Sequence, residues 1–304
     1  MKQFNVWVQA CRLRTLPLAG ASIIVAGGLA YQYQVFNLSI FLLSLITALL
    51  LQILSNLANG YGDALTGADD HRIGPDIGMQ SGLINESSMK KAILLVIVAC
   101  LLSGLSLLSI SFGNDLTSWL IFLGLGALAI VAAITYTMGK LPYGYRALGD
   151  ISVFMFFGLL GVLGSFYLQA LTLPVEIVLP AFSVGLLSAS VLNINNIRDV
   201  YNDKAANKIT LVVLLGRKKA FIYHLVLLLS AMLCSILYIN LLQDSQFWQY
   251  LFLLVASPLI KSAIELAVAI KQDQRDGAIF NEQLKNTSIS AFVFSILFAI
   301  ALVS

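Results

Sequence analysis

The sequence predicts an all-α integral membrane protein, in which nine transmembrane helices form a single domain over residues 1–304. Hydrophobic residues make up 59% of the chain and charged residues 11%, and the mean hydropathy is +0.89, whereas a soluble domain carries about 25% charged residues. Nine apolar stretches are long enough to cross a bilayer. The basic residues outside these stretches all fall on one side of the predicted bundle.

The length of each stretch justifies one helix, because crossing about 30 Å of hydrocarbon takes roughly 20 apolar residues. In chain order the predicted helices cover residues 16–33, 40–57, 92–112, 119–138, 151–170, 177–195, 221–239, 247–270 and 287–303. Helices are expected rather than barrel strands, since the stretches lack the alternation of a lipid-facing strand. The first stretch is longer than a signal-peptide core and lacks an Ala-x-Ala cleavage site, so we expect it to be retained.

The distribution of Lys and Arg predicts the orientation of the bundle. With nine crossings, the segment before the first helix shares a side with the loops after the second, fourth, sixth and eighth helices. These segments hold all the Lys and Arg except Lys261, which lies inside the eighth helix. The positive-inside rule makes this side cytoplasmic and leaves the C-terminus outside, and we expect the bacterial cytoplasmic (inner) membrane. The net charge of +3 therefore indicates topology and attraction to anionic lipid or substrate, and gives no reason to expect a nucleic-acid partner.

Two polar stripes continue predicted helices on the cytoplasmic side. One follows the second helix at i, i+3 and i+7, and the other follows the sixth helix at i, i+4 and i+8, so each stripe occupies one helix face. The residues are Asn56, Asn59 and Asp63 in the first stripe and Asn195, Asp199 and Asp203 in the second. Both contain an Asn-x-x-x-Asp kernel, which suggests a weak internal repeat whose equivalent helix ends face one another.

The residue types in the stripes favour a magnesium and diphosphate site. Two facing rows of carboxylates repel one another unless a cation lies between them. Oxygen ligands without His or Cys select Mg²⁺, whose coordination shell commonly includes phosphate oxygens as well. The nearby basic residues Arg72, Arg198 and Lys208 can neutralise phosphate oxygens. The alternative is that these residues are helix caps and interfacial groups, but the matched kernels favour the site.

The motifs resemble those of a known family. The segments NLANGYGDALTGADDHRIGP and LNINNIRDVYNDKAANKITLVVLLG resemble the two Asp-rich motifs of the UbiA-type intramembrane prenyltransferases. The segment ITYTMGKLPYGYRALGDISVFMFFG, with RLRTLPLAGASIIV and ILSNLAN before it, is similar to the branch that acts on 1,4-dihydroxy-2-naphthoate. The resemblance implies the UbiA-type helical fold and Mg²⁺-dependent transfer of a polyprenyl group from polyprenyl diphosphate to 1,4-dihydroxy-2-naphthoate. Carbon dioxide would leave, giving demethylmenaquinol for menaquinone biosynthesis.

The resemblance also implies roles for individual residues. The implied metal ligands are Asn59, Asp63, Asp69, Asn195, Asp199 and Asp203, and the implied diphosphate contacts are Arg72 and Lys208, joined by Arg198. Asp63, Asp199, Arg72 and Lys208 would be the catalytic residues. For the acceptor, Arg12 is a candidate to bind the carboxylate and Asp150 to orient a hydroxyl, and Tyr143 is an aromatic candidate. Arg12 as a membrane anchor and Asp150 as a helix N-terminal charge stay open.

Two positions depart from the family pattern. Where the family usually reads Asn-Asp-x-x-Asp, this chain has Gly60 after Asn59 and so lacks one carboxylate. In the segment that usually reads TLxVRLG, Leu214 replaces the Arg. Both departures are expected to weaken the binding of metal and diphosphate, unless the two positions do not contact these ligands directly.

Other functions are open at this stage. A secondary transporter places ionisable residues near the bilayer midplane at broken helices, whereas here only Lys261 and Glu265 lie inside a predicted helix. A phospholipid head-group transferase would carry an Asp-Gly kernel with a Gly-x-x-x-Asp-x-x-x-Asp segment, which the sequence lacks. A prenyltransferase for 4-hydroxybenzoate or homogentisate is disfavoured by the resemblance alone.

Overall fold

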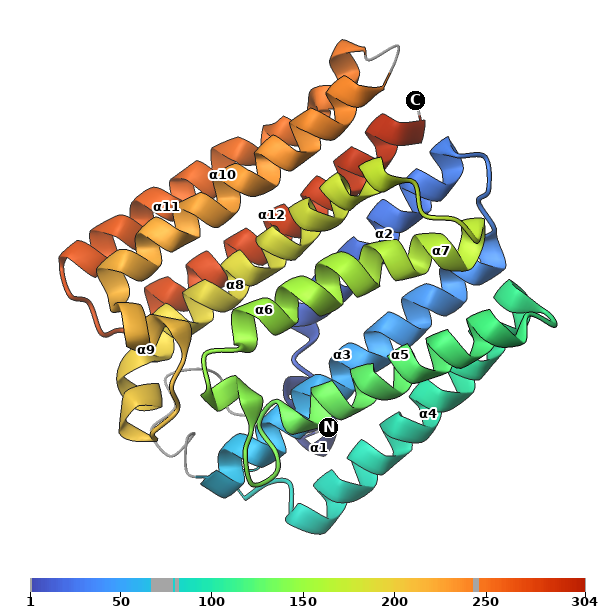
Figure 1. Cartoon of the computed structure of the whole chain (residues 1–304). Helices are drawn as coiled ribbons and strands as arrows, with labels where there is room; N and C mark the ends of the chain where they lie inside the picture. The colour runs from blue at the N-terminus through green and yellow to red at the C-terminus, as the bar shows by residue number, and fades with distance from the viewer. Residues whose placement is uncertain (1, 67–78, 80–81, 243–245, 304) are drawn as a thin grey trace.

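The computed structural model describes residues 2–66, 79, 82–242 and 246–303 and is helical over most of this length. In chain order the elements are α1 (Lys2–Ala10), η1 (Leu13–Thr15), α2 (Leu16–Gln32), α3 (Leu38–Thr66), α4 (Glu86–Phe112), α5 (Leu116–Thr135), η2 (Tyr143–Tyr145), α6 (Gly149–Val153), η3 (Phe154–Gly164), α7 (Ser165–Ala170), η4 (Val175–Ile177), α8 (Val178–Ala205), α9 (Leu211–Leu215), α10 (Arg217–Leu241), η5 (Phe247–Val255), α11 (Ala256–Lys271) and α12 (Gly277–Val303). The described elements confirm the predicted all-α fold class (Figure 1).

Each predicted transmembrane stretch corresponds to one long helical segment. Within the described ranges, eight segments are long and apolar enough to cross a membrane, with α6, η3 and α7 forming one of them, and η4 with α8 and η5 with α11 forming two more. The predicted helix 16–33 is α2, whose 17 residues rise about 25 Å. It is therefore slightly shorter than the other eight. The helices α3 and α8 extend past their predicted ends, so both polar stripes are helical.

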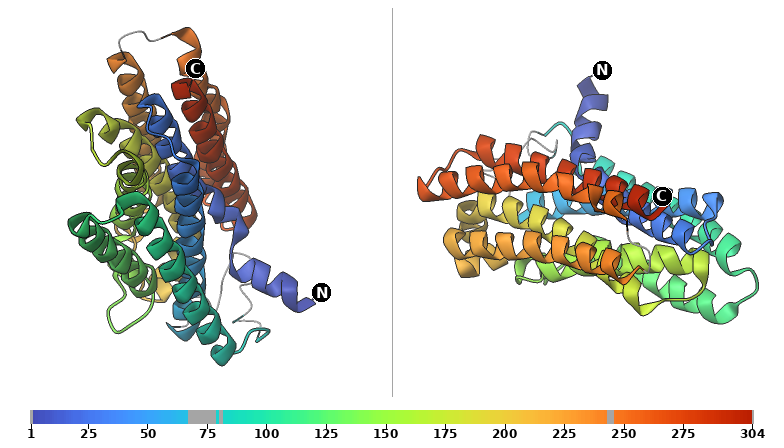
Figure 2. Two further views of the ribbon diagram at one scale, coloured as in Figure 1. Left: turned by 90° about the vertical axis from the view of Figure 1, so that its right-hand side faces the viewer. Right: turned by 90° about the horizontal axis from the view of Figure 1, so that it is seen from above.

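The centre of the bundle is formed by α2, α8 and α12, with α10 and α11 on one flank and α3, α4 and α5 on the other (Figures 1 and 2). The fully buried Val25, Ile194 and Phe294 lie in the core that joins α2, α8 and α12. Large apolar side chains point outward on the flanks, such as Leu95 on α4 and Leu229 on α10. An outward-facing apolar surface suits lipid and agrees with a multi-pass membrane protein.

Local sequence explains where several helices begin and how closely two of them pack. The side chain of Asn85 accepts from the Ser88 amide at 2.8 Å and caps α4, and Asp115 caps α5 in the same way. The π-helical segment η3 approaches α8 at Gly158, where an added Cβ would lie 2.7 Å from the Ala181 carbonyl oxygen. Only a residue without a side chain permits this approach.

The two ends of the described chain lie toward opposite ends of the bundle (Figure 1 and the left view of Figure 2). The short helix α1 stands off from the bundle in both views of Figure 2. The end of the bundle at which α3 and α8 finish and α10 begins is called the polar end below, because both polar stripes lie there.

Candidate active site

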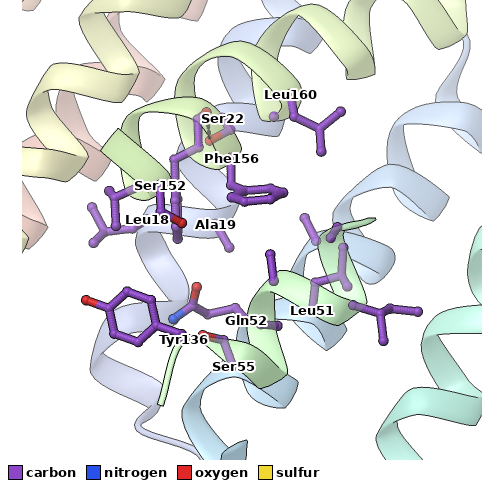
Figure 3. A pocket seen from close by; sticks show the side chains of 18 of the residues that line it. Leu18, Ala19, Ser22, Leu51, Gln52, Ser55, Tyr136, Ser152, Phe156 and Leu160 are labelled. Atoms are coloured by element: carbon purple, nitrogen blue, oxygen red, sulfur yellow. Dashed lines mark hydrogen bonds between the residues drawn. The ribbon is translucent and has the colours of Figure 1, made fainter. Parts of the chain in front are cut away.

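One cavity of about 690 Å³ runs from the polar end into the apolar interior. Its polar wall is formed by α3, α8 and the segment after α8, and its apolar wall by α4, α5 and η3. Figure 3 shows the middle of this cavity, with Gln52 and Tyr136 on one side and Phe156 and Leu160 on the other. The cavity therefore offers a charged head region and an apolar tail region in one continuous space.

The first polar stripe lies on α3 and the second on α8, and they are called the first and second acid rows below. Asn59 and Asp63 both line the cavity. The hydroxyl of Thr137 donates to the Asn59 side-chain oxygen at 3.2 Å, and the hydroxyl of Tyr145 donates to Asp63 Oδ1 at 2.8 Å. Asn56 lies one turn earlier and donates to the Cys11 carbonyl oxygen at 2.9 Å, which ties α3 to the start of the chain. The row is thus held by hydrogen bonds from the loop that follows α5.

The second acid row lies on α8, where Asn195, Asp199 and Asp203 line the same cavity. Arg198 stands next to this row and is 2% exposed. Its Nε donates to Asp199 Oδ1 at 2.7 Å, one terminal nitrogen donates to Asn195 Oδ1 at 2.9 Å, and the other donates to Asn281 Oδ1 on α12 at 2.6 Å. Arg198 is not among the described lining residues, so it contacts the row from behind.

Lys208 joins the two rows. Its Nζ lies 3.8 Å from Asp63 Oδ1 and 3.6 Å from Asp203 Oδ1, so one ammonium group contacts an acid on each helix. Asn207 adopts a left-handed conformation with φ of 55°, which turns the chain so that the Lys208 amide bonds the Asp203 carbonyl oxygen at 2.8 Å. Burial opposes the charged form of Lys208, but the two carboxylates outweigh it and raise the pKa of Lys208 above its ordinary value.

Two of the three predicted acceptor-binding residues line the cavity, and the third does not. Arg12 and Tyr143 line the cavity. The Tyr143 hydroxyl donates to the Ala132 carbonyl oxygen at 3.0 Å, so its ring rather than its hydroxyl is available to a ligand. Asp150 is buried and lies outside the described lining residues. A direct contact between Asp150 and a ligand in the cavity is therefore not supported by its position.

The remaining sequence-based residues fall elsewhere. Asp69 and Arg72, predicted to bind metal and diphosphate, lie outside the described residues. Gly60 is buried in α3 and does not line the described cavity wall. Leu214, where the family commonly has Arg, lies on α9 with 63% of its surface exposed and is also not part of that wall. Neither departure therefore belongs to the described lining of the cavity.

Several polar lining residues, Gln52 and Asn202 among them, were not predicted from the sequence. Gln52 and Asn202 both line the cavity. Gln52 precedes Asn56 by four residues and donates to the Asn56 side-chain oxygen at 3.2 Å, while Asn202 follows Asp199 by three residues. Gln52 lies one turn before the stripe on α3, so extending its period would have found it, whereas Asn202 lies inside the stripe on α8, next to Asp203.

The donor atoms of the site fit Mg²⁺. Among the described residues, no three His, Cys, Asp or Glu side chains lie close enough to hold a metal ion on their own. The wall instead combines the carboxylates of Asp63, Asp199 and Asp203 with the amide oxygens of Asn59 and Asn195. Hard oxygen donors divided between two helices suit a magnesium ion whose remaining ligands are phosphate oxygens.

Comparison with known sequences identifies the family that this chain matches. The model of the UbiA prenyltransferase family matches residues 21–302. A protein of Escherichia coli (strain K12) named 1,4-dihydroxy-2-naphthoate octaprenyltransferase is 46% identical over 299 residues, covering 98% of this chain and 95% of that protein. A protein of Haemophilus influenzae with the same name is 47% identical over 267 residues, covering 86% of each chain. These relatives are transferases, which disfavours the transporter alternative.

Comparison with solved structures supports the fold. The structure of a UbiA homolog from Archaeoglobus fulgidus bound to GPP and Mg²⁺ has a TM-score of 0.60 and 17% identity, covering 96% of this chain and 99% of that one. The apo structure of a UbiA homolog from Aeropyrum pernix K1 has a TM-score of 0.59 and 16% identity, covering 94% and 96%. At such identities the likeness concerns the helical architecture alone.

Proposed function

Since the chain belongs to the UbiA prenyltransferase family, we propose that it transfers a polyprenyl group from polyprenyl diphosphate to 1,4-dihydroxy-2-naphthoate with loss of carbon dioxide, which gives demethylmenaquinol for menaquinone biosynthesis. The observation that carries this proposal is the single cavity whose polar end holds both acid rows and whose remainder is apolar. A diphosphate fits the polar end and an isoprenoid chain fits the rest. The chain acts as one domain in this proposal.

The polar end binds the diphosphate in this reaction. Asp63, Asp199 and Asp203 would hold Mg²⁺ together with the amide oxygens of Asn59 and Asn195. When bound there, Mg²⁺ supplies Lewis-acid stabilisation of the charge that develops on the leaving diphosphate. The E. coli and H. influenzae relatives are named as octaprenyltransferases, and one archaeal homolog was solved with GPP and Mg²⁺, which supports this assignment.

Lys208 contributes a fixed positive charge to the same site. Because the adjacent carboxylates raise its pKa, Lys208 keeps its proton and serves as a donor to phosphate oxygens rather than as a base. Arg198 orients Asp199 and Asn195 from behind the wall. Its buried position gives Arg198 a part in shaping the diphosphate site through these two residues, rather than through direct contact.

The apolar part of the cavity protects the reacting carbon. Cleavage of the allylic C–O bond produces a carbocation-like centre, which water would capture in an open site. Phe156 and Leu160 from η3 and Phe122 from α5 face this part of the cavity. The lining residues Leu101, Leu105 and Leu123 are exposed, so the surrounding protein does not cover them. The polyprenyl tail would therefore leave the cavity sideways into lipid between α4, α5 and η3.

The acceptor ring reacts with the allylic carbon from which the diphosphate leaves. Its electron-rich ring needs no strong base, because carbon dioxide leaves where a proton would otherwise be lost. Arg12 on the cavity wall would bind the acceptor carboxylate, and the Tyr143 ring would pack against the aromatic system. The proposal places the polar end in the cytoplasm and the protein in the inner membrane, where water-soluble acceptor and lipid-soluble tail can meet.

The test is an assay with purified protein in nanodiscs. Octaprenyl diphosphate, 1,4-dihydroxy-2-naphthoate and Mg²⁺ are expected to give prenylated product, and EDTA or Asp199→Asn is expected to lower kcat/KM by about 100-fold or more, because charge stabilisation of the leaving group is lost. The matched control is Asp115→Asn, because Asp115 caps α5 outside the cavity and Asn caps equally well. Full activity in EDTA, or faster prenylation of 4-hydroxybenzoate or homogentisate, would contradict the proposal.

A further inference from the structure

The segment after η2 is paired with the segment after α8. The Ala147 amide donates to the Ile209 carbonyl oxygen at 2.7 Å, and the Ile209 amide donates to the Tyr145 carbonyl oxygen at 3.2 Å. These bonds form an isolated parallel bridge between Arg146 and Ile209. The pairing fixes the backbone of Tyr145 directly beside Lys208, although the two residues are 63 positions apart in the sequence.

The Tyr145 side chain contacts the first acid row and Lys208, the cation that contacts both rows. Its hydroxyl donates to Asp63 Oδ1 at 2.8 Å and lies 2.8 Å from Thr66 Oγ1, both on α3. The Nζ of Lys208 lies 5.3 Å from the centre of the Tyr145 ring, within the range of a cation–π contact. One side chain therefore holds an acid of the first row and the cation that this acid shares with Asp203.

Tyr145 acts on these groups and not on the ligand. It is absent from the described lining residues of the cavity, whereas Asp63 and Lys208 line it. The Tyr145 hydroxyl donates to Asp63 Oδ1 from outside the described lining of the cavity. A donor behind the wall restricts the rotamer of Asp63, while the ring restricts the position of the Lys208 ammonium.

We propose that Tyr145 is a positioning residue that couples the two acid rows, holding Asp63 and Lys208 at the separation at which magnesium and prenyl diphosphate are bound. The inference rests on the proposed function, because it assumes that the rows bind this ligand. It gives the β-bridge between the segments after η2 and α8 a role, since this pairing holds Tyr145 beside Lys208.

The test compares Tyr145→Phe with Tyr33→Phe. Tyr33 donates to Glu176 Oε1 at 2.7 Å near the end of α2. Each variant therefore loses one tyrosine–carboxylate hydrogen bond, but only the bond of Tyr145 lies at the proposed site. Binding of farnesyl thiolodiphosphate with Mg²⁺ is measured without acceptor, together with kcat and KM. We expect Tyr145→Phe to weaken binding about tenfold, as loss of a hydrogen bond to a charged group does, and to raise KM more than it lowers kcat. Tyr33→Phe should bind like the wild type.

A double-mutant cycle separates positioning from general stability. If Tyr145 acts through Asp63, Tyr145→Phe should cause little further loss of affinity in an Asp63→Asn background. An equal loss in both backgrounds, or unchanged binding by Tyr145→Phe, would overturn the inference while leaving the proposed function intact. A wild-type protein that binds no prenyl diphosphate would overturn both. If Tyr145→Phe does not fold, Thr66→Val decides, because weakened binding supports the inference and unchanged binding overturns it.

Discussion

The contact of Lys208 with both acid rows leads to a prediction about the metal-free protein. The ammonium lies within 4.0 Å of Asp63 and Asp203, so it occupies the place where the two rows need a shared cation. Substitution by Met keeps the length of the side chain and removes its charge. In Lys208→Met without Mg²⁺, the two carboxylates face one another without this counter-ion. The variant should therefore depend on Mg²⁺ for stability to a greater degree than the wild type.

The size of the effect follows from the distances. At an effective dielectric constant of about 20, each pair has a Coulomb energy of about 4 kcal/mol, and desolvation of the three groups offsets much of it. Removing one partner of a buried ion pair typically costs about 3–5 kcal/mol. For a chain of this size, such a loss lowers Tm by about 5 °C or more. Mg²⁺ binds the folded site and should recover a large part of the difference.

The assay is thermal unfolding in detergent, followed by intrinsic fluorescence with EDTA and with Mg²⁺. Lys90→Met is the matched control, because Lys90 forms an ion pair with Glu86 at 2.7 Å at the start of α4 but is 60% exposed, and such surface pairs contribute little. We expect the control to behave like the wild type in both solutions. Equal Mg²⁺-induced shifts in Lys208→Met and the wild type, or an unchanged Tm in EDTA, would refute the reasoning.

Two further predictions concern glycines. Gly126 lines the cavity and has open space around it, so Gly126→Trp should fill the tail region and lower kcat/KM for octaprenyl diphosphate by about tenfold or more. The control is Gly124→Trp, since Gly124 also has open space but is not a described lining residue, and an equal loss in both variants would contradict the tail assignment. Gly158→Val should destabilise the protein by about 1–3 kcal/mol, because its Cβ would meet the Ala181 carbonyl oxygen at 2.7 Å. Thermal unfolding beside Gly124→Val checks this, and similar Tm values for the two would argue against the close packing of η3 on α8.

The arrangement of the rows also bears on the residue that the family pattern would place at Gly60. Lys208 brings positive charge directly to Asp63, and the described cavity wall does not include Gly60. The site proposed here consists of the remaining acids of the two rows, Asp63, Asp199 and Asp203.

The sequence by itself determined the fold class, the approximate helix positions and the two polar stripes. These features depend on properties that neighbouring residues carry, namely the length of an apolar stretch and the helical period of its polar side chains. The stripes on α3 and α8 were predicted residue by residue, and both line one cavity. The family resemblance supplied the chemistry that the pattern alone left open.

Only the tertiary structure decided which side chains in and around the stripes contact one another. Arg198 is adjacent to Asp199 in sequence, but a helix turns by about 100° per residue, so the Arg198 side chain reaches Asn281 on α12 instead of the cavity. Lys208 and Tyr145 join the rows because two loops, far apart in the chain, form one β-bridge. Such contacts depend on how helices pack and loops return, and no local period in the sequence records them.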